Sequence, residues 1–207
     1  MRLRIISCCV LLLSTILMAA PLHAGAITVK DADDRNVTFN PAGKTVVVLN
    51  CNPTTQWRTR DAGMALDTFQ GNKNFRLIVL VDLRSSMAKV VKGYVMKRMR
   101  TDLDAEAVRI KPFYAAKGNL DNPRNDISVI PDWNGSICAQ LSWPEESPNF
   151  RAVVFKDGQE LKRFDNLTED GPLVAAVRTA LTPKPAVATK AAKPATETPK
   201  IAGANLD

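Results

Sequence analysis

The sequence predicts an α/β domain in which helices flank a central mixed β-sheet, preceded by an N-terminal hairpin. Two continuous apolar runs, Thr45–Leu49 and Phe75–Leu83, are typical of parallel strands buried on both faces, and helical spacing follows each. Asp157-Gly158 is a strong hairpin-turn signal between two further strand-like segments. Two parallel strands beside an antiparallel pair make a mixed sheet.

The first elements are justified by their apolar patterns. Ile27–Phe39 alternates apolar and polar residues around a short acidic turn, which predicts the small hairpin. After the strand Thr45–Leu49, helical spacing predicts a helix that ends near Gly71. Its expected apolar positions are Trp57, Met64, Leu66 and Phe69.

A second helix is predicted from a cap at Ser85 or Ser86 to about Arg100. The expected buried stripe recurs at helical spacing, and Lys and Arg fall mostly on the other side, which predicts a solvated basic face. A face that binds a membrane or nucleic acid is the alternative. The stripe is Met87, Val90, Val91, Tyr94, Val95 and Met99, and the basic side chains are Lys89, Lys92, Lys97, Arg98 and Arg100.

The C-terminal half is predicted from shorter signals. Asp102–Ala116 has the composition of a further helix, and Ile127–Ile130 that of a short strand. Ser136–Trp143 is expected to contain a short helix. Strands Arg151–Lys156 and Gln159–Phe164 flank the Asp157-Gly158 turn, and Leu173–Leu181 closes the domain as a helix capped from Thr168-Glu169-Asp170.

The two ends of the chain have other compositions. Residues 1–26 combine a basic start, an apolar run and Ala24-Gly25-Ala26, as in a cleaved signal peptide. Residues 182–207 are rich in Pro, Ala, Lys and Thr and lack hydrophobic periodicity, which predicts a disordered tail. We therefore expect a folded domain over residues 27–181, a periplasmic or secreted location, and no transmembrane segment after cleavage.

Composition excludes several kinds of site from the mature chain. The single histidine, His23, falls in the predicted leader, so no His-dependent catalytic set and no His-ligated zinc site is expected. Asp31, Asp33 and Asp34 lack the glycine and distal glutamate of a calcium loop. We expect no metal and no cofactor. The net charge of +7 includes both chain ends and has no nucleic-acid motif beside it, so no nucleic-acid partner is expected.

Three stretches carry a resemblance to the thioredoxin-like superfamily, in its redoxin and peroxiredoxin branch. Residues 43–49 (GKTVVVL) resemble the strand that leads to the active site of that family. Residues 132–135 (DWNG), with Ile137 and Trp143, resemble the segment before its cis-proline. Residues 147–158 (SPNFRAVVFKDG) resemble the cis-proline strand and the turn after it, so Pro148 matches the cis-proline. The resemblance spans Ile27–Leu181 and implies an exported bacterial protein with a thioredoxin-like fold.

The active-site cysteines of that family are missing here. The family carries its reactive cysteine at the start of the first helix, where the helix N-terminus lowers the pKa of the thiol. The matching stretch, residues 52–57 (NPTTQW), has no cysteine, and a threonine hydroxyl without a base is a poor nucleophile. The family's reductase or peroxidase activity therefore does not carry over.

Cys51 and Cys138 have three interpretations. Each is a small buried hydrophobe, or the two form a disulfide, or Cys51 is a displaced nucleophile that Cys138 resolves. Trp57, Trp133 and Trp143 are expected mainly in core or rim packing, with a ligand groove near Pro148 as the alternative.

Two functions follow from these patterns. The favoured one is an exported, non-catalytic binding module of the cell envelope. It would hold a protein partner or envelope surface at a groove or on the basic helix, and the groove residues are Asn52, Pro53, Thr54, Thr55, Gln56 and Pro148. The alternative is a thiol-disulfide oxidoreductase or peroxidase-like enzyme that uses Cys51.

Overall fold

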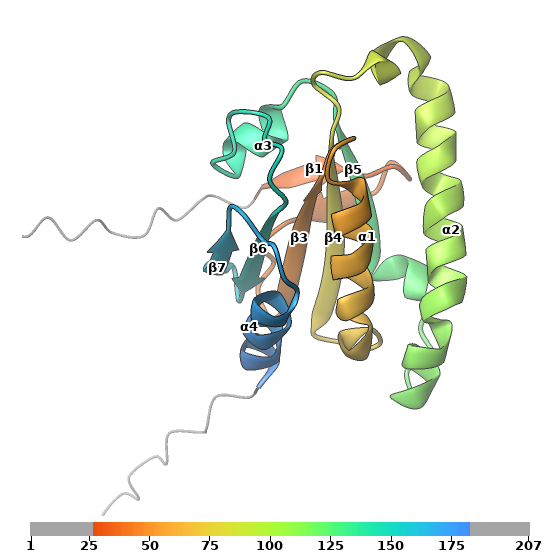
Figure 1. Ribbon diagram of the computed structural model, residues 1–207. Helices are drawn as coiled ribbons and strands as arrows, with labels where there is room; N and C mark the ends of the chain where they lie inside the picture. Colours follow the sequence, from red (N-terminus) through yellow and green to blue (C-terminus); the bar gives the residue numbers. More distant parts are fainter. Residues whose placement is uncertain (1–26, 183–207) are drawn as a thin grey trace, which may run out of the picture.

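A computed structural model of the protein describes residues 27–182 (Figure 1). The predicted leader, and the predicted tail after residue 182, lie outside the described residues. The central sheet has five strands in the order β5-β4-β3-β6-β7. Their bounds are β3 Thr45–Cys51, β4 Phe75–Asp82, β5 Ile127–Asp132, β6 Arg151–Lys156 and β7 Gln159–Phe164.

The strand directions confirm the predicted mixed sheet. Strand β3 is parallel to β4, and β4 is parallel to β5. Strand β6 is antiparallel to β3 and to β7. The antiparallel hairpin of β1 (Thr28–Lys30) and β2 (Asn36–Thr38) is a separate small sheet, also as predicted. This order and these directions are those of the thioredoxin-like arrangement.

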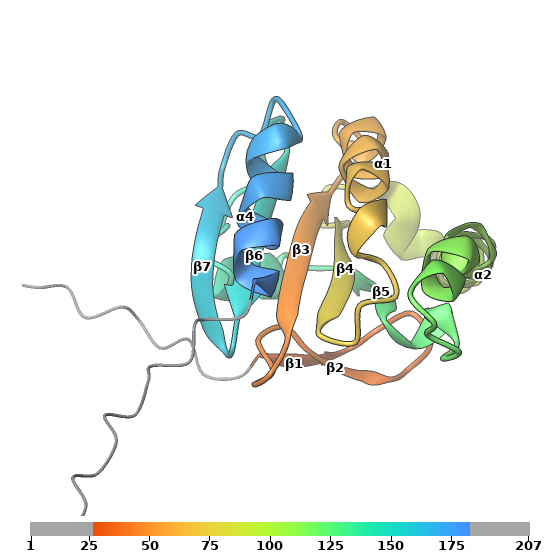
Figure 2. The same ribbon diagram turned by 90° about the horizontal axis from the view of Figure 1, so that it is seen from below.

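Alternating residues of β3 point into two different cores. Val47 and Leu49 belong to the core that α1, α2 and α4 cover, whereas Val46 and Val48 belong to the core under the hairpin and α3. Figure 2 shows α4, α1 and α2 arranged along the sheet from β7 toward β5. The helices are α1 Gln56–Ala65, α2 Lys92–Ala116, α3 Ser136–Gln140 and α4 Gly171–Leu181.

The apolar face predicted for the first helix is partly wrong. Helix α1 ends at Ala65, and a 3-10 turn (η1, Asp67–Phe69) follows it. Trp57 and Met64 are exposed, and the buried α1 positions are Thr59 and Ala62. The small side chains of Thr59 and Ala62 let α1 lie close to the sheet. The large side chains of Trp57 and Met64 lie on its outer side.

The second predicted helix also differs from the structure. Residues Met87–Val91 form a 3-10 helix (η2), where three residues per turn replace the spacing from which the buried stripe was predicted. Helix α2 then runs without a break to Ala116, so the predicted boundary near Arg100 is wrong. Four stripe residues are exposed: Met87, Val90, Val91 and Tyr94. The buried α2 residues are Met99, Leu103, Ile110 and Tyr114.

Two cap predictions have different outcomes. Ser86 accepts a hydrogen bond from the Ala88 N–H, so it caps η2. Asp170 precedes α4 but makes no capping bond, and its carboxylate instead accepts from Arg58. No helix in the described part of the chain is both long and apolar enough to cross a bilayer.

Gly71 gives a test of the packing between η1 and α2. Its φ is +80°, and a β-carbon there would lie 2.7 Å from the backbone Cα of Tyr114. We expect Gly71→Ala to lower the free energy of unfolding by about 2–4 kcal/mol, because left-handed strain and a backbone clash add. Urea unfolding monitored by circular dichroism measures the loss.

Gly43→Ala is the matched control. Gly43 has a similar φ, +76°, but no atom lies within 4 Å of the added β-carbon. We expect the free energy of unfolding to fall by only about 1 kcal/mol, because the left-handed backbone strain is present without a clash. Equal losses in the two variants would show that the contact with Tyr114 has no energetic weight.

Candidate functional site

A buried asparagine organises the turn between β3 and α1. Strand β3 ends at Cys51, and α1 begins at Gln56. The Asn52 side chain in this turn accepts hydrogen bonds through Oδ1 from the backbone N–H groups of Thr54 and Thr55, both at 2.9 Å. In return, the Asn52 N–H donates to Thr55 Oγ1 at 3.1 Å. These bonds hold the turn that leads into α1, whose N-cap Thr55 makes no side-chain capping bond.

The same side chain joins this turn to the segment before β6. Asn52 Nδ2 donates to the backbone oxygen of Ser147 at 2.8 Å. Ser147 directly precedes Pro148, so two segments about 95 residues apart in sequence meet here, as the predicted site requires. No peptide bond in residues 27–182 is cis, and the bond before Pro148 is therefore trans, unlike the cis-proline it was matched to.

The predicted site residues divide into a buried and an exposed set. Asn52 and Thr55 are each 2% exposed, so they hold the turn and cannot offer their side chains to a partner. The exposed residues form a surface that we call the α1 tip, and it includes one residue more than the predicted set. The α1 tip consists of Pro53, Thr54, Gln56, Trp57 and Pro148.

Trp57 dominates the α1 tip, with 62% of the residue exposed. The Arg58 guanidinium lies 5.5 Å from the centroid of its ring and 5.7 Å from that of Phe150. Arg58 also pairs with Asp170 at 2.9 Å, which fixes the arginine between α1 and α4. Arg58 was not among the predicted site residues, and its only signal in the sequence was an arginine next to an aromatic residue at a helix start.

The two cysteines are free and lie on opposite faces of the sheet. Cys51 bonds to Thr59 of α1, whereas Cys138 of α3 belongs to the core under the hairpin. Burial raises the pKa of the Cys51 thiol above its ordinary value, against a smaller lowering by the bond to Thr59. Burial, with the nearby carboxylates of Asp82 and Asp132, raises the pKa of Cys138 to about 12. The disulfide interpretation and the resolving role of Cys138 have no support in this geometry.

A polar cluster lies at the carboxyl ends of the three parallel strands. Asn50 Nδ2 donates to Cys138 Sγ at 3.4 Å, and Asp132 Oδ2 accepts from the Cys138 N–H at 2.8 Å. Arg84 pairs with Asp82 at 2.9 Å, and this contact raises the pKa of the arginine. The signal in the sequence was a polar residue near the end of each buried run: Asn50, Asp82 and Asp132.

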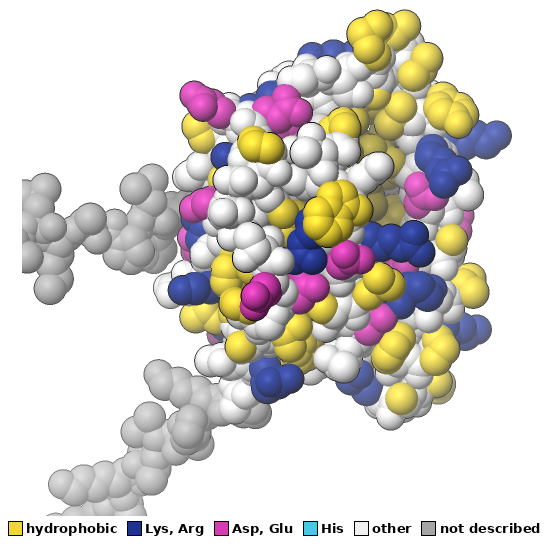
Figure 3. All heavy atoms as spheres, in the orientation of Figure 1, with side chains coloured by type: hydrophobic (Ala, Val, Ile, Leu, Met, Phe, Trp, Pro, Cys, Tyr) yellow, Lys and Arg dark blue, Asp and Glu magenta, His cyan; other side chains and the backbone are white. Residues whose placement is uncertain are grey.

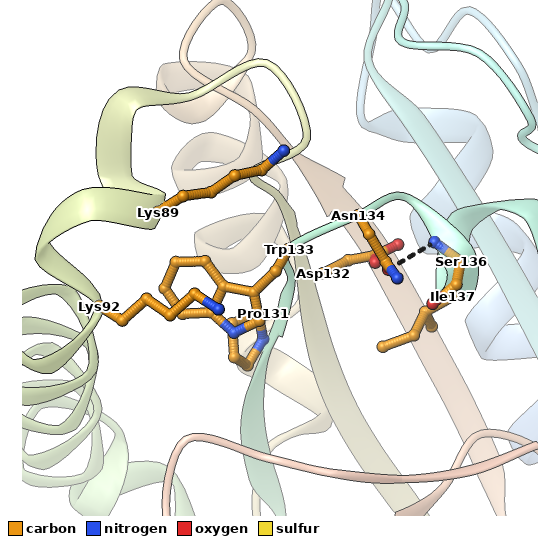
Figure 4. A pocket seen from close by; sticks show the side chains of 8 residues that line it. All are labelled: Lys89, Lys92, Pro131, Asp132, Trp133, Asn134, Ser136 and Ile137. Atoms are coloured by element: carbon orange, nitrogen blue, oxygen red, sulfur yellow. Dashed lines mark hydrogen bonds between the residues drawn. The ribbon is translucent and has the colours of Figure 1, made fainter.

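The three tryptophans do not line one groove. Trp143 is buried, and its ring N–H donates to Asp165 Oδ1 at 2.9 Å. Trp133 lines an open pocket of about 440 Å³, toward which Lys89 and Lys92 project from the neighbouring segment (Figure 4). The Lys92 ammonium lies 5.2 Å from the Trp133 ring centroid. The packing interpretation is therefore confirmed for Trp143. The three tryptophans do not together line a groove near Pro148.

The acidic turn of the hairpin is held by arginines. Asp31 accepts from the backbone of Asp33 and Arg35 and pairs with the Arg35 guanidinium at 2.7 Å. Arg124 pairs with Asp33 at 2.7 Å, and Arg100 with Asp34 at 3.0 Å. Over residues 27–182, no three His, Cys, Asp or Glu side chains are grouped as metal ligands.

The Asn52 bonds predict a large effect of substitution. We expect Asn52→Ala to lower the free energy of unfolding by about 2–4 kcal/mol, because it removes the buried acceptor of the Thr54 and Thr55 N–H groups and the donor to the Ser147 oxygen. Thr54→Ala, in the same turn but at an exposed side chain, should change it by less than about 0.5 kcal/mol. Thermal unfolding of both variants measures the difference, and equal effects would contradict the role given to Asn52.

Comparisons with known proteins found similar solved structures, but no protein-family model and no curated protein matches the chain. A solved structure of a putative thioredoxin from Neisseria meningitidis is 17% identical, with 78% of this chain and 91% of that chain covered and a TM-score of 0.46. A thiol:disulfide interchange protein from Chlorobium tepidum is 15% identical, with 79% and 99% covered and a TM-score of 0.48. By the order and directions of its strands, this chain has the thioredoxin-like fold.

Proposed function

We propose that this chain is an exported, non-catalytic binding module of the cell envelope that holds a protein partner at the α1 tip. One observation carries the proposal: Asn52 and Thr55 bond to each other in the buried turn that leads into α1, where a redox protein of this fold places a thiol. The leader-like composition of residues 1–26 supports export to the periplasm or beyond.

The position of the sulfur atoms supports the non-catalytic part of the proposal. A thiol becomes reactive when a helix N-terminus or a cation stabilises its thiolate. Cys51 is the last residue of β3, before the turn and not on α1, and burial raises its pKa. At neutral pH it is therefore protonated and largely shielded, which disfavours the oxidoreductase alternative.

Partner binding is supported by the shape and stiffness of the α1 tip. Large aromatic side chains are frequent centres of binding energy in protein interfaces. Trp57 is exposed, yet Arg58 stacks on its ring and is itself held by Asp170. Pro53 and Pro148 restrict the backbone on either side of the Asn52 bonds, so little conformational freedom is lost on binding.

Thiol chemistry tests the non-catalytic part. We expect Cys51 and Cys138 of the folded protein to react with iodoacetamide at neutral pH far more slowly than after unfolding, because both pKa values are raised. Disulfide reduction and peroxide consumption should be absent, and Cys51→Ser should leave both at that background. Turnover that disappears in Cys51→Ser would establish the enzyme alternative.

Site-specific crosslinking tests the partner. A photoreactive residue at Gln56 is expected to capture one defined envelope protein in the producing cells, and Trp57→Ala should reduce the yield at least about tenfold, as for a central interface aromatic. The same photoreactive residue at Val108, an exposed position on α2, is the control. Equal crosslinking from both positions would contradict a specific α1 tip.

A further inference from the structure

We propose that a second surface, formed by η2 and the start of α2, binds membranes that contain anionic lipid. This surface, the η2 patch, is separate from the α1 tip and does not depend on a partner there. Figure 3 shows hydrophobic side chains gathered over η2 and the first part of α2, with basic side chains next to them. The η2 patch consists of Met87, Val90, Val91 and Tyr94 with Lys89, Lys92 and Lys97.

The apolar part of the η2 patch is not explained by the core. Met87, Val90 and Tyr94 are 82%, 80% and 71% exposed. The inward side of the same segment already supplies Ala88, Val95 and Met96, which pack against the core. Tyr94 and Lys97 lie on the side of α2 opposite Met99 and Leu103, as helical geometry requires. The segment therefore has two apolar faces: one packs against the core, and the other is exposed to solvent.

The charge of the segment has one sign. Residues 84–100 contain six Lys or Arg and no Asp or Glu. In the described chain Lys89, Lys92 and Lys97 form no ion pair, whereas Arg84, Arg98 and Arg100 do. No acidic residue lies in the first turn of α2, where acids would be favoured by the helix dipole. Lys92, which lies in that turn, therefore works against helix stability, and the three lysines are suited to an external anion.

The shape of the η2 patch favours a lipid surface over a folded protein. In Figure 1, η2 and the start of α2 form an outer corner of the molecule, beyond the sheet. A convex corner of apolar side chains with lysines around it is how interfacial segments enter the headgroup region, since lysine stems stay in the apolar zone while the ammonium reaches phosphate. Tyrosine and tryptophan prefer the same depth.

The pocket beside the η2 patch fits a lipid phosphate at its mouth. Lys89 and Lys92 border it, and Trp133 lies between them and the wall formed by Asn134 and Ser136 (Figure 4). Asp132, which also lines it, is buried to 1% exposure and bonded to the Cys138 N–H. Its carboxylate would repel an anion deeper in the pocket, so a phosphate would bind at the mouth, where the two lysines are.

Vesicle sedimentation tests the proposal, with the protein purified in the form that the producing cells export. We expect binding to phosphatidylcholine vesicles that also contain phosphatidylglycerol, weak binding to phosphatidylcholine alone, and loss of binding at high salt. Replacing Lys89, Lys92 and Lys97 by Gln should weaken binding about a hundredfold, at about fivefold per lysine. The control replaces Lys73, Lys111 and Lys117 by Gln, exposed lysines without ion pairs in the described chain.

The apolar part has its own variant pair. Val90→Ser with Tyr94→Ser should weaken binding, whereas Val108→Ser with Leu120→Ser, which are as exposed but lie outside the η2 patch, should not. Equal effects of the two lysine triples or of the two apolar pairs, or equal binding to both kinds of vesicle, would overturn the proposal. So would no vesicle binding at all, which would assign the η2 patch to a protein. None of these results affects crosslinking at Gln56, so this inference fails separately from the α1 tip.

Discussion

The burial of β3 on both faces is the constraint on which the rest of the structure depends. A strand at the centre of a sheet pairs on both edges and gives its side chains alternately to two cores, so its register determines both. Val47 and Leu49 place α1 and α4 on one face, and Val46 and Val48 place the hairpin on the other. A shift of one residue would exchange the two cores. It would also move Cys51 to the face that Cys138 occupies.

The same register decides the chemistry at the end of the strand. Asn50 points toward Cys138, Cys51 toward α1, and Asn52 into the turn that begins the helix. Asn52 contributes hydrogen bonds in several directions, which a thiol at this position could not do. The turn is therefore held together by permanent bonds within the chain.

Strands and turns with a regular pattern in the sequence were predicted correctly. The runs that became β3 and β4, and the hairpin at Asp157-Gly158, were predicted because central strands and tight turns have local signatures. The exposure of Trp57 and Tyr94 was not predictable, because apolar spacing identifies a helix face without showing whether another element covers it. The bond from Asn52 to Ser147 was likewise invisible, since it joins segments that only the completed fold brings together.

The two proposed surfaces lie at one end of the molecule because of the parallel strands. The chain passes from the carboxyl end of β3 into the α1 tip, and from the carboxyl end of β4 into η2. Residues that follow adjacent parallel strands emerge at the same edge of the sheet, which is where such folds generally carry their functional residues. A domain that contacts lipid through η2 would thus present Trp57 from the same edge, near the membrane surface. With both proposals taken together, the fold would set a protein contact and a lipid contact side by side, a task that needs rigid placement and no reactive sulfur.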